Sequence, residues 1–165
     1  MTSSPPAAAP TTQSPPAPSP PQSPAKLTAA CPFLDAPELA ELLGMAPDTV
    51  SATEAAPETS SGGIQLECDY HQGGRNPYAL TVSGFPAGTL SVADLVDAIP
   101  NDAQNVHTLS GIGQAAISYS TADGFTLLCA GTLSHGQSRA ATITAPKTLS
   151  QAALIEIVKR VVSRL

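Results

Sequence analysis

The chain has 165 residues, of which 42% are hydrophobic, 12% are charged and 4% are aromatic, with no tryptophan. This composition excludes a highly charged disordered protein and predicts a core made mainly of aliphatic side chains. The net charge of −6 would repel phosphate backbones, so we expect no nucleic-acid partner. No apolar run reaches the roughly 18 residues that a membrane-spanning helix needs.

The beginning of the chain differs sharply from the rest. Nine prolines lie among Ala, Ser, Thr and Gln in residues 1–24, and no charged residue precedes Lys26. Such a segment cannot bury enough apolar surface to offset the entropy lost on ordering, so we expect an extended, disordered spacer with polyproline II character. We therefore predict a tether over residues 1–26 and a single domain over residues 27–165. A tail without a role is the alternative.

The first element of the domain is a predicted helix. Asp35 is a suitable N-cap for a helix over residues 36–43, which Gly44 would end. The following residues, 45–63, show no periodicity, and we expect a long loop there.

A strand pair and a second helix follow. Apolar and polar residues alternate over residues 64–70 and again over residues 78–82, with turn residues between them, which predicts an antiparallel hairpin. Ser91, with Asp94 three residues later, is a good N-cap for a helix over residues 92–99.

The last third of the sequence predicts a loop, a three-stranded meander and an amphipathic helix. After a loop over residues 101–110, three strands are expected near residues 114–120, 125–133 and 138–145. Thr148 and Gln151 form a predicted capping box for the final helix, whose apolar residues fall on one stripe. Runs of strands, rather than alternating units, indicate an α+β fold: a mainly antiparallel sheet of about five strands packed by about three helices.

Three cysteines, Cys31, Cys68 and Cys129, leave one unpaired if two of them form a disulfide. A bridge between Cys31 and Cys68 would fix the first helix to the sheet, and a bridge between Cys68 and Cys129 could join two strands. Three free thiols in a cytosolic protein are the third possibility. The spacing of the cysteines and histidines matches no common zinc pattern, so we expect no metal site.

The candidate catalytic motifs favour structural roles. Gly111 and Gly113 lack the third glycine and the following helix of a dinucleotide site, which favours a turn before a strand. Ser134 beside His135 lacks an oriented base and an oxyanion hole, which favours a hairpin turn. Cys129, in an apolar strand, is expected to be an inert buried thiol. Solvated surface or core-edge roles are expected for the remaining candidates: Glu54, Glu58, Phe85, Asp94 and Asp97.

Several short motifs occur together in one order. They are Cys31-Pro32-Phe33-Leu34-Asp35, Glu38-Leu39-Ala40, Leu43-Gly44, Glu67-Cys68-Asp69-Tyr70 and Leu109-Ser110-Gly111-Ile112-Gly113-Gln114-Ala115-Ala116. Over about residues 26–165, the chain resembles the actinobacterial secreted lipoproteins grouped as domain of unknown function 3558.

The resemblance implies that Cys31 and Cys68 form the disulfide and leaves Cys129 as a departure from the family pattern. It supplies no catalytic residue and no cofactor. By analogy, the fold would be similar to the curved, helix-packed sheet of Mog1/PsbP-like proteins. Family members carry a signal peptide that ends at a lipid-modified cysteine. We therefore expect the chain to be a mature form, with Met1 at or near the modified position.

These observations together predict a non-enzymatic cell-envelope lipoprotein domain. It would lie outside the cytoplasm, anchored to the outer face of the membrane through a lipid or secreted. We expect a monomer without cofactor that binds an envelope protein or a lipid-like apolar ligand beneath its helices. The alternative is a sensory or inhibitory ectodomain that acts on another envelope protein, and the third hypothesis is an unrecognised hydrolase that uses Ser134 or Cys129.

Overall fold

The computed structural model describes Met1 and residues 23–165. The predicted tether over residues 1–26 lies outside the described residues except for Met1 and residues 23–26. The described elements are, in chain order, η1 (Cys31–Phe33), α1 (Ala36–Leu42), β1 (Val50–Glu54), β2 (Glu58–Ser60), β3 (Gly63–Gln72), β4 (Arg75–Pro86), α2 (Val92–Val96), β5 (Gln104–Leu109), β6 (Ala115–Ser120), β7 (Phe125–Ser134), β8 (Gln137–Pro146) and α3 (Gln151–Val162).

The strands form one antiparallel sheet in the order β1-β3-β4-β8-β7-β6-β5, and β2 pairs with β3 beside β1. The α+β class is therefore confirmed, as are the β3–β4 hairpin and the β6–β7–β8 meander. The sheet has eight strands, however, where the sequence predicted about five.

The three missed strands lie in segments that the sequence predicted as loops. β1 and β2 fall within residues 45–63, and β5 falls within residues 101–110. Only Val50 of β1 is buried, every residue of β2 is exposed, and β5 is exposed except for the half-buried Leu109. Main-chain hydrogen bonds to β3 and β6 hold these strands, so their side chains need not alternate and leave no periodic signal.

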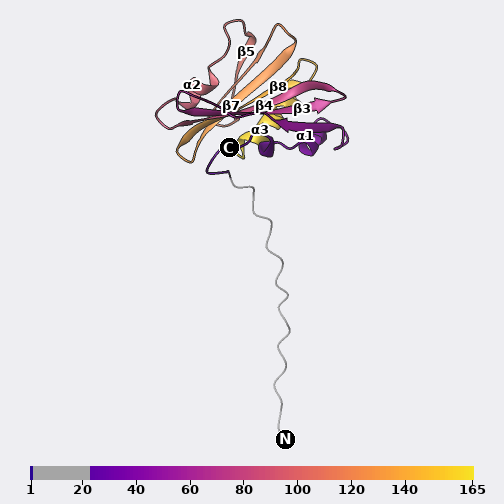
Figure 1. Cartoon of the computed structure of the whole chain (residues 1–165), viewed down its shortest axis with the longest axis horizontal. Helices are drawn as coiled ribbons and strands as arrows, with labels where there is room; N and C mark the ends of the chain where they lie inside the picture. Colours follow the sequence, from indigo (N-terminus) through magenta and orange to yellow (C-terminus); the bar gives the residue numbers. More distant parts are fainter. Residues whose placement is uncertain (2–22) are drawn as a thin grey trace.

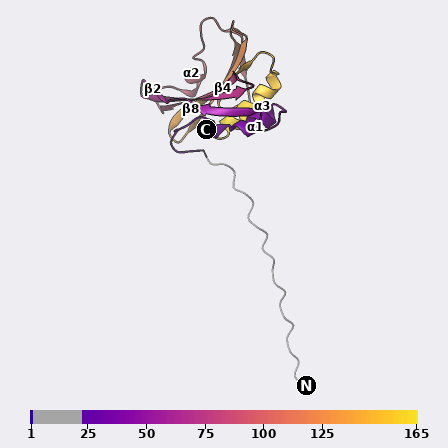
Figure 2. The same cartoon turned by 45° about the vertical axis from the view of Figure 1, so that its right-hand side comes forward.

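Helices cover the two faces of the sheet unequally. Figures 1 and 2 show α1 and α3 side by side on one face, while α2 lies on the other. α3 packs against β7 and β8, whereas α2 packs against one end of β6, β7 and β8. The rest of the α2 face is an open sheet surface. In the described residues, no helix is both long and apolar enough to cross a membrane.

Side chains of β7 and β8 point alternately to the two faces of the sheet and contribute to two hydrophobic clusters. Leu128, Ala130 and Ile143 belong to the larger cluster beneath α1 and α3. Cys129 and Ala140 belong to a small cluster beneath α2. The central strands are therefore buried on both faces, which is why their burial patterns read as nearly continuous.

Side-chain caps begin all three α-helices. The Asp35 cap of α1 and the Ser91–Asp94 capping box of α2 are confirmed, although α2 ends at Val96 rather than near residue 99. The predicted capping box of Thr148 and Gln151 is wrong. Instead, the Ser150 hydroxyl accepts a hydrogen bond from the main-chain N–H of Ala153, and α3 begins at Gln151.

Candidate functional site

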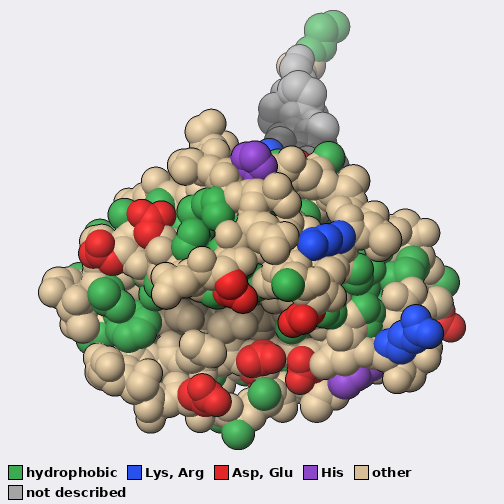
Figure 3. All heavy atoms as spheres, turned by 90° about the horizontal axis from the view of Figure 1, so that it is seen from above, with side chains coloured by type: hydrophobic (Ala, Val, Ile, Leu, Met, Phe, Trp, Pro, Cys, Tyr) green, Lys and Arg blue, Asp and Glu red, His purple; other side chains and the backbone are tan. Residues whose placement is uncertain are grey.

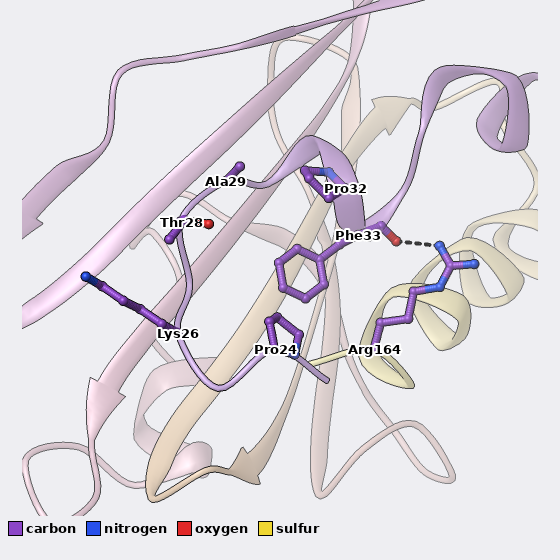
Figure 4. A pocket seen from close by; sticks show the side chains of 7 residues that line it. All are labelled: Pro24, Lys26, Thr28, Ala29, Pro32, Phe33 and Arg164. Atoms are coloured by element: carbon purple, nitrogen blue, oxygen red, sulfur yellow. Dashed lines mark hydrogen bonds between the residues drawn. The ribbon is translucent and has the colours of Figure 1, made fainter. Parts of the chain in front are cut away.

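A cavity of about 270 Å³ opens where the start of the domain meets the end of α3. The lining residues are Pro24, Lys26, Thr28, Ala29, Pro32, Phe33 and Arg164. Figure 4 shows the Phe33 ring between Pro24 and Pro32, with Lys26 at the outer rim and Arg164 on the opposite side. The cavity therefore combines an apolar floor with a basic side chain on each side.

Residues 24–33 form one wall of the cavity, and two contacts fix the end of this segment to the sheet. A disulfide joins Cys31 of η1 to Cys68 of β3, with their Cα atoms 5.0 Å apart. The Glu54 carboxylate, at the end of β1, accepts hydrogen bonds from the main-chain N–H groups of Ala30 and Cys31. Because η1 has no side-chain cap of its own, Glu54 supplies acceptors for its first N–H groups.

Packing on β3 and β4 holds the same segment from below. Leu27 is buried against Gly84 of β4, where an added Cβ would lie 2.5 Å from the Leu27 Cδ1 atom. The Tyr70 hydroxyl, on β3, donates to the main-chain oxygen of Leu34. Burial, reinforced by neighbouring carboxylates, raises the pKa of Tyr70 above its ordinary value, so the phenol stays protonated and can donate.

Arg139 of β8 secures the outer part of the wall. Its guanidinium is fully buried and donates to the main-chain oxygens of Pro24 at 2.6 Å, Ala25 at 3.0 Å and Leu165 at 2.6 Å. The Gln137 side-chain oxygen accepts two further hydrogen bonds. Burial lowers the pKa of Arg139, and no acidic side chain of the described residues pairs with it. One side chain thus joins the last residues of the predicted tether to Leu165, three residues after α3.

The two basic side chains of the cavity are not equivalent. Arg164 forms a two-pronged ion pair with Glu38 of α1, at 2.6 and 2.7 Å, and also donates to the Phe33 main-chain oxygen at 2.8 Å. The hydrogen bond to Glu38 is the main cause of the raised pKa of Arg164. Lys26 is exposed and makes no ion pair within the described residues. Its charge is therefore the one available to a bound anion.

The lining of this cavity suits binding rather than catalysis. Thr28 carries its only side-chain hydroxyl, and no histidine, carboxylate or thiol lines it. A nucleophile without an adjacent base is weak at its ordinary pKa. An apolar floor beside a basic rim is complementary to an amphiphile with an anionic head.

The predicted disulfide between Cys31 and Cys68 is confirmed. Cys129 is the free cysteine, and it lies beneath α2 on the opposite face from Cys68. A bridge between Cys68 and Cys129 is therefore excluded. Burial raises the pKa of the Cys129 thiol, and a hydrogen bond with Thr142 offsets this effect only in part. Cys129 is therefore an inert buried thiol, as predicted.

The glycine motif and the Ser-His pair both lie in turns, as predicted. Gly113 has φ +57° and approaches β7 so closely that an added Cβ would lie 2.3 Å from the Gly131 main-chain oxygen. His135 and Gly136 have φ values of 49° and 69° and form the β7–β8 hairpin turn. The His135 Nε2 atom lies 3.0 Å from the main-chain oxygen of Ser23, so the imidazole contacts the last residues of the predicted tether.

Two other candidates have structural roles. The ring of Phe85 covers Gly63 on the neighbouring strand, where an added Cβ would lie 2.2 Å from a ring atom. Asp94 is bound to its cap partner Ser91, and this bond lowers the pKa of the carboxyl. Glu54 is exposed, as expected of a surface carboxylate, but strand β1, which the sequence did not predict, also places its carboxylate at the main-chain N–H groups of η1.

One group of side chains resembles a metal site in its geometry. The ligand atoms of Cys31, Glu54 and Cys68 lie within 4.8 Å of one another. Both sulfurs are bonded to each other, so neither is available as the thiolate that metal ions prefer. This group is a disulfide beside a capping carboxylate.

The open sheet surface is acidic. Glu67 and Asp69 of β3 lie on the side away from the buried Cys68, and Glu58 of β2 lies close enough to affect Glu67. Burial is the main cause of the raised pKa of Glu67, followed by the charges of Asp69 and Glu58. Figure 3 shows that acidic side chains outnumber basic ones on the face opposite α1 and α3, around a shallow hollow.

Sequence reasoning did not find the cavity. Pro32 and Phe33 drew attention only as part of a family motif, and Lys26 only as the first charge after the spacer. No sequence motif singles out Arg164. The one usable signal was the pair Pro32 and Phe33 next to Cys31, since a disulfide next to apolar residues indicates a segment fixed to the core.

Comparison with known proteins gives little. No family model and no curated protein sequence matches the chain. Among solved structures, the chain is similar to the extracellular domain of PknH from Mycobacterium tuberculosis, with a TM-score of 0.46 and 12% sequence identity, over 81% of this chain and 93% of that one. A similarity this low says nothing about function. The resemblance to the lipoprotein family stays a prediction.

Proposed function

We propose that this chain is a non-enzymatic, extracytoplasmic domain that binds an amphiphilic ligand with an anionic head in the cavity beside Phe33. The observation that carries the proposal is the apolar floor next to Lys26, a basic side chain without an ion pair in the described residues. A hydrocarbon chain would cover the Phe33 ring and the two prolines, while its head group would meet the ammonium group.

The disulfide supports a place outside the cytoplasm, because disulfides persist in oxidising compartments and are rare in reducing ones. We further propose that the domain belongs to the actinobacterial lipoproteins of domain of unknown function 3558, is anchored through a lipid before its proline-rich spacer, and acts as a monomer. The Cys31–Cys68 pair and the spacer composition support this proposal.

The test is binding of a fluorescent fatty acid, cis-parinaric acid, to the full chain. Thr28 is exposed at the mouth of the cavity, and a Thr28→Trp variant would place an indole ring in it. We expect saturable binding by the natural chain and a loss of affinity of at least about tenfold in the variant. Thr59→Trp, on the exposed strand β2, is the matched control and should bind like the natural chain.

Lys26→Gln should lower the affinity for the fatty acid by about three- to tenfold and leave the affinity for its alcohol analogue unchanged, because only the acid carries a charge. Absence of saturable binding, or equal binding by Thr28→Trp, would contradict the proposal. Native mass spectrometry of the purified chain provides a second readout, since a retained ligand adds a discrete mass.

A docking role as a sensory or inhibitory ectodomain is the second candidate, and the acidic open sheet surface favours it. A basic protein partner would then bind through Glu67 and Asp69. In a pull-down, a Glu67→Lys/Asp69→Lys variant would lose such a partner while Thr28→Trp retained it. The opposite result would assign the interaction to the cavity.

A further inference from the structure

A second cavity, of about 260 Å³, lies on the α3 face near the β5 edge of the sheet. It is separate from the cavity beside Phe33 and shares no lining residue with it. The side chains that matter for its chemistry are His107 of β5, Ser118 and Ser120 of β6, Thr126 of β7, Lys147 before α3 and Gln151 at its first turn. The cavity is therefore polar where the rest of this face is apolar.

The two serines are the informative residues. Ser118 is 3% exposed and Ser120 is 9% exposed, yet no described residue forms a hydrogen bond with either hydroxyl. Ser118 lies between Leu128 and His107 on neighbouring strands, in a position where the same face buries leucine and alanine. Buried hydroxyls normally find partners, because an unpaired one costs free energy.

The adjacent Thr121, which follows β6, lies outside the cavity. Its hydroxyl oxygen is fully buried and has no hydrogen-bond partner within the described residues, but Thr121 does not line the cavity. Ser118 and Ser120 do line it, so their hydroxyls are the ones that a bound molecule can reach.

The charges around the cavity indicate the sign of that molecule. Lys147 lines the cavity and makes no ion pair in the described residues, and no aspartate or glutamate lines it. α3 has 12 residues and begins here. Ser150 occupies the N–H groups of Ala153 and Leu154, so the main-chain N–H groups of Gln151 and Ala152 stay available. Every one of these groups favours a negative ligand.

We propose that this cavity binds a small anion, a carboxylate or phosphate, whose oxygens accept hydrogen bonds from Ser118, Ser120 and the start of α3 while Lys147 neutralises its charge. The lining is polar rather than apolar, so the cavity suits a small polar anion and not a hydrocarbon chain. This site is independent of the amphiphile cavity, and either one can exist without the other.

The test uses ¹H–¹⁵N NMR spectra of the full chain, titrated with inorganic phosphate and separately with citrate, at constant ionic strength in chloride. We expect at least one anion to give saturable shifts at the amides of Gln151 and Ala152. Lys147→Gln should lower the affinity for that anion by about tenfold. The two titrations also distinguish the sources, since a phosphate site prefers the first anion and a carboxylate site the second.

Matched controls keep the result specific. Lys159→Gln removes a lysine of the same helix that lies beside Glu156 instead, at 3.3 Å, and should leave binding unchanged. A Ser118→Ala/Ser120→Ala variant, with its fold checked by the same spectra, should weaken the anion by about tenfold or more. If neither anion gives saturable shifts, or if Lys147→Gln and Lys159→Gln bind equally, the proposal is overturned.

Discussion

Arg139 is a buried side chain that connects the start of the described segment with its end. Its guanidinium connects Pro24 and Ala25 with Leu165, residues that lie 115, 114 and 26 positions away in the sequence. Its partners are three main-chain oxygens and the side-chain oxygen of Gln137. A buried guanidinium of this kind is stabilising only while its acceptors stay in place.

We predict that Arg139→Met lowers the free energy of unfolding by about 2–4 kcal/mol, because the acceptors lose charged donors while the apolar stem is retained. The measurement is denaturant unfolding. Arg75→Met, at the exposed β3–β4 turn, is the matched control and should change the free energy by less than about 0.5 kcal/mol. An Arg139 variant as stable as the control would mean that these hydrogen bonds are replaced by water at no cost.

At the scale of elements, the N-cap of α3 lies two residues later than the local sequence pattern predicts. Thr148 and Gln151 have the spacing of a capping box, but Ser150 is in the extended conformation of a cap, with φ −65° and ψ 145°. The backbone after β8 turns through a hydrogen bond from Leu149 to Pro146, which delays the helix. The geometry of the preceding connection therefore selects the cap.

We predict that Ser150→Ala lowers the free energy of unfolding by about 1 kcal/mol, because the N–H of Ala153 loses its acceptor. Thr148→Ala should have almost no effect, since Thr148 is exposed and forms no side-chain hydrogen bond in the described residues. Chemical denaturation of the two variants side by side decides between the caps. A larger effect of Thr148→Ala would restore the cap expected from the sequence.

At the scale of the whole molecule, one covalent bond controls both the start of the domain and its cavity. Cys31 and Cys68 are 37 residues apart, and the loop between them includes α1, β1 and β2. Residues 24–33, which form the cavity wall, precede any regular strand and have no sheet partner. Their order depends on the disulfide, on Glu54 and on Arg139.

We predict that a Cys31→Ala/Cys68→Ala variant is less stable by about 4 kcal/mol in the chain-entropy account, and that it binds cis-parinaric acid more weakly. Dithiothreitol should destabilise the natural chain and leave the variant unchanged. Thiol titration of the denatured, unreduced natural chain should detect one free thiol, Cys129. Three thiols, or an unfolding midpoint indifferent to reductant, would contradict this account.

The sequence alone determined the elements in which the spacing of apolar residues marks the buried face. Three parts of the fold place one face against the core: the β3–β4 hairpin, the meander from β6 to β8, and α3 with its amphipathic stripe. Their hydrophobic patterns can therefore be recognised in the sequence without knowledge of the tertiary structure. The helix caps at Asp35 and Ser91 are equally local.

Tertiary structure decided what local patterns cannot encode. β1, β2 and β5 exist because a neighbour offers main-chain hydrogen bonds, and such bonds are independent of side-chain type. The cavity beside Phe33 needs Arg164, 131 residues further along the chain. The two unpartnered serines become unusual only when β5, β7 and α3 enclose them. Periodicity describes one element at a time, whereas a binding site is made where several elements meet.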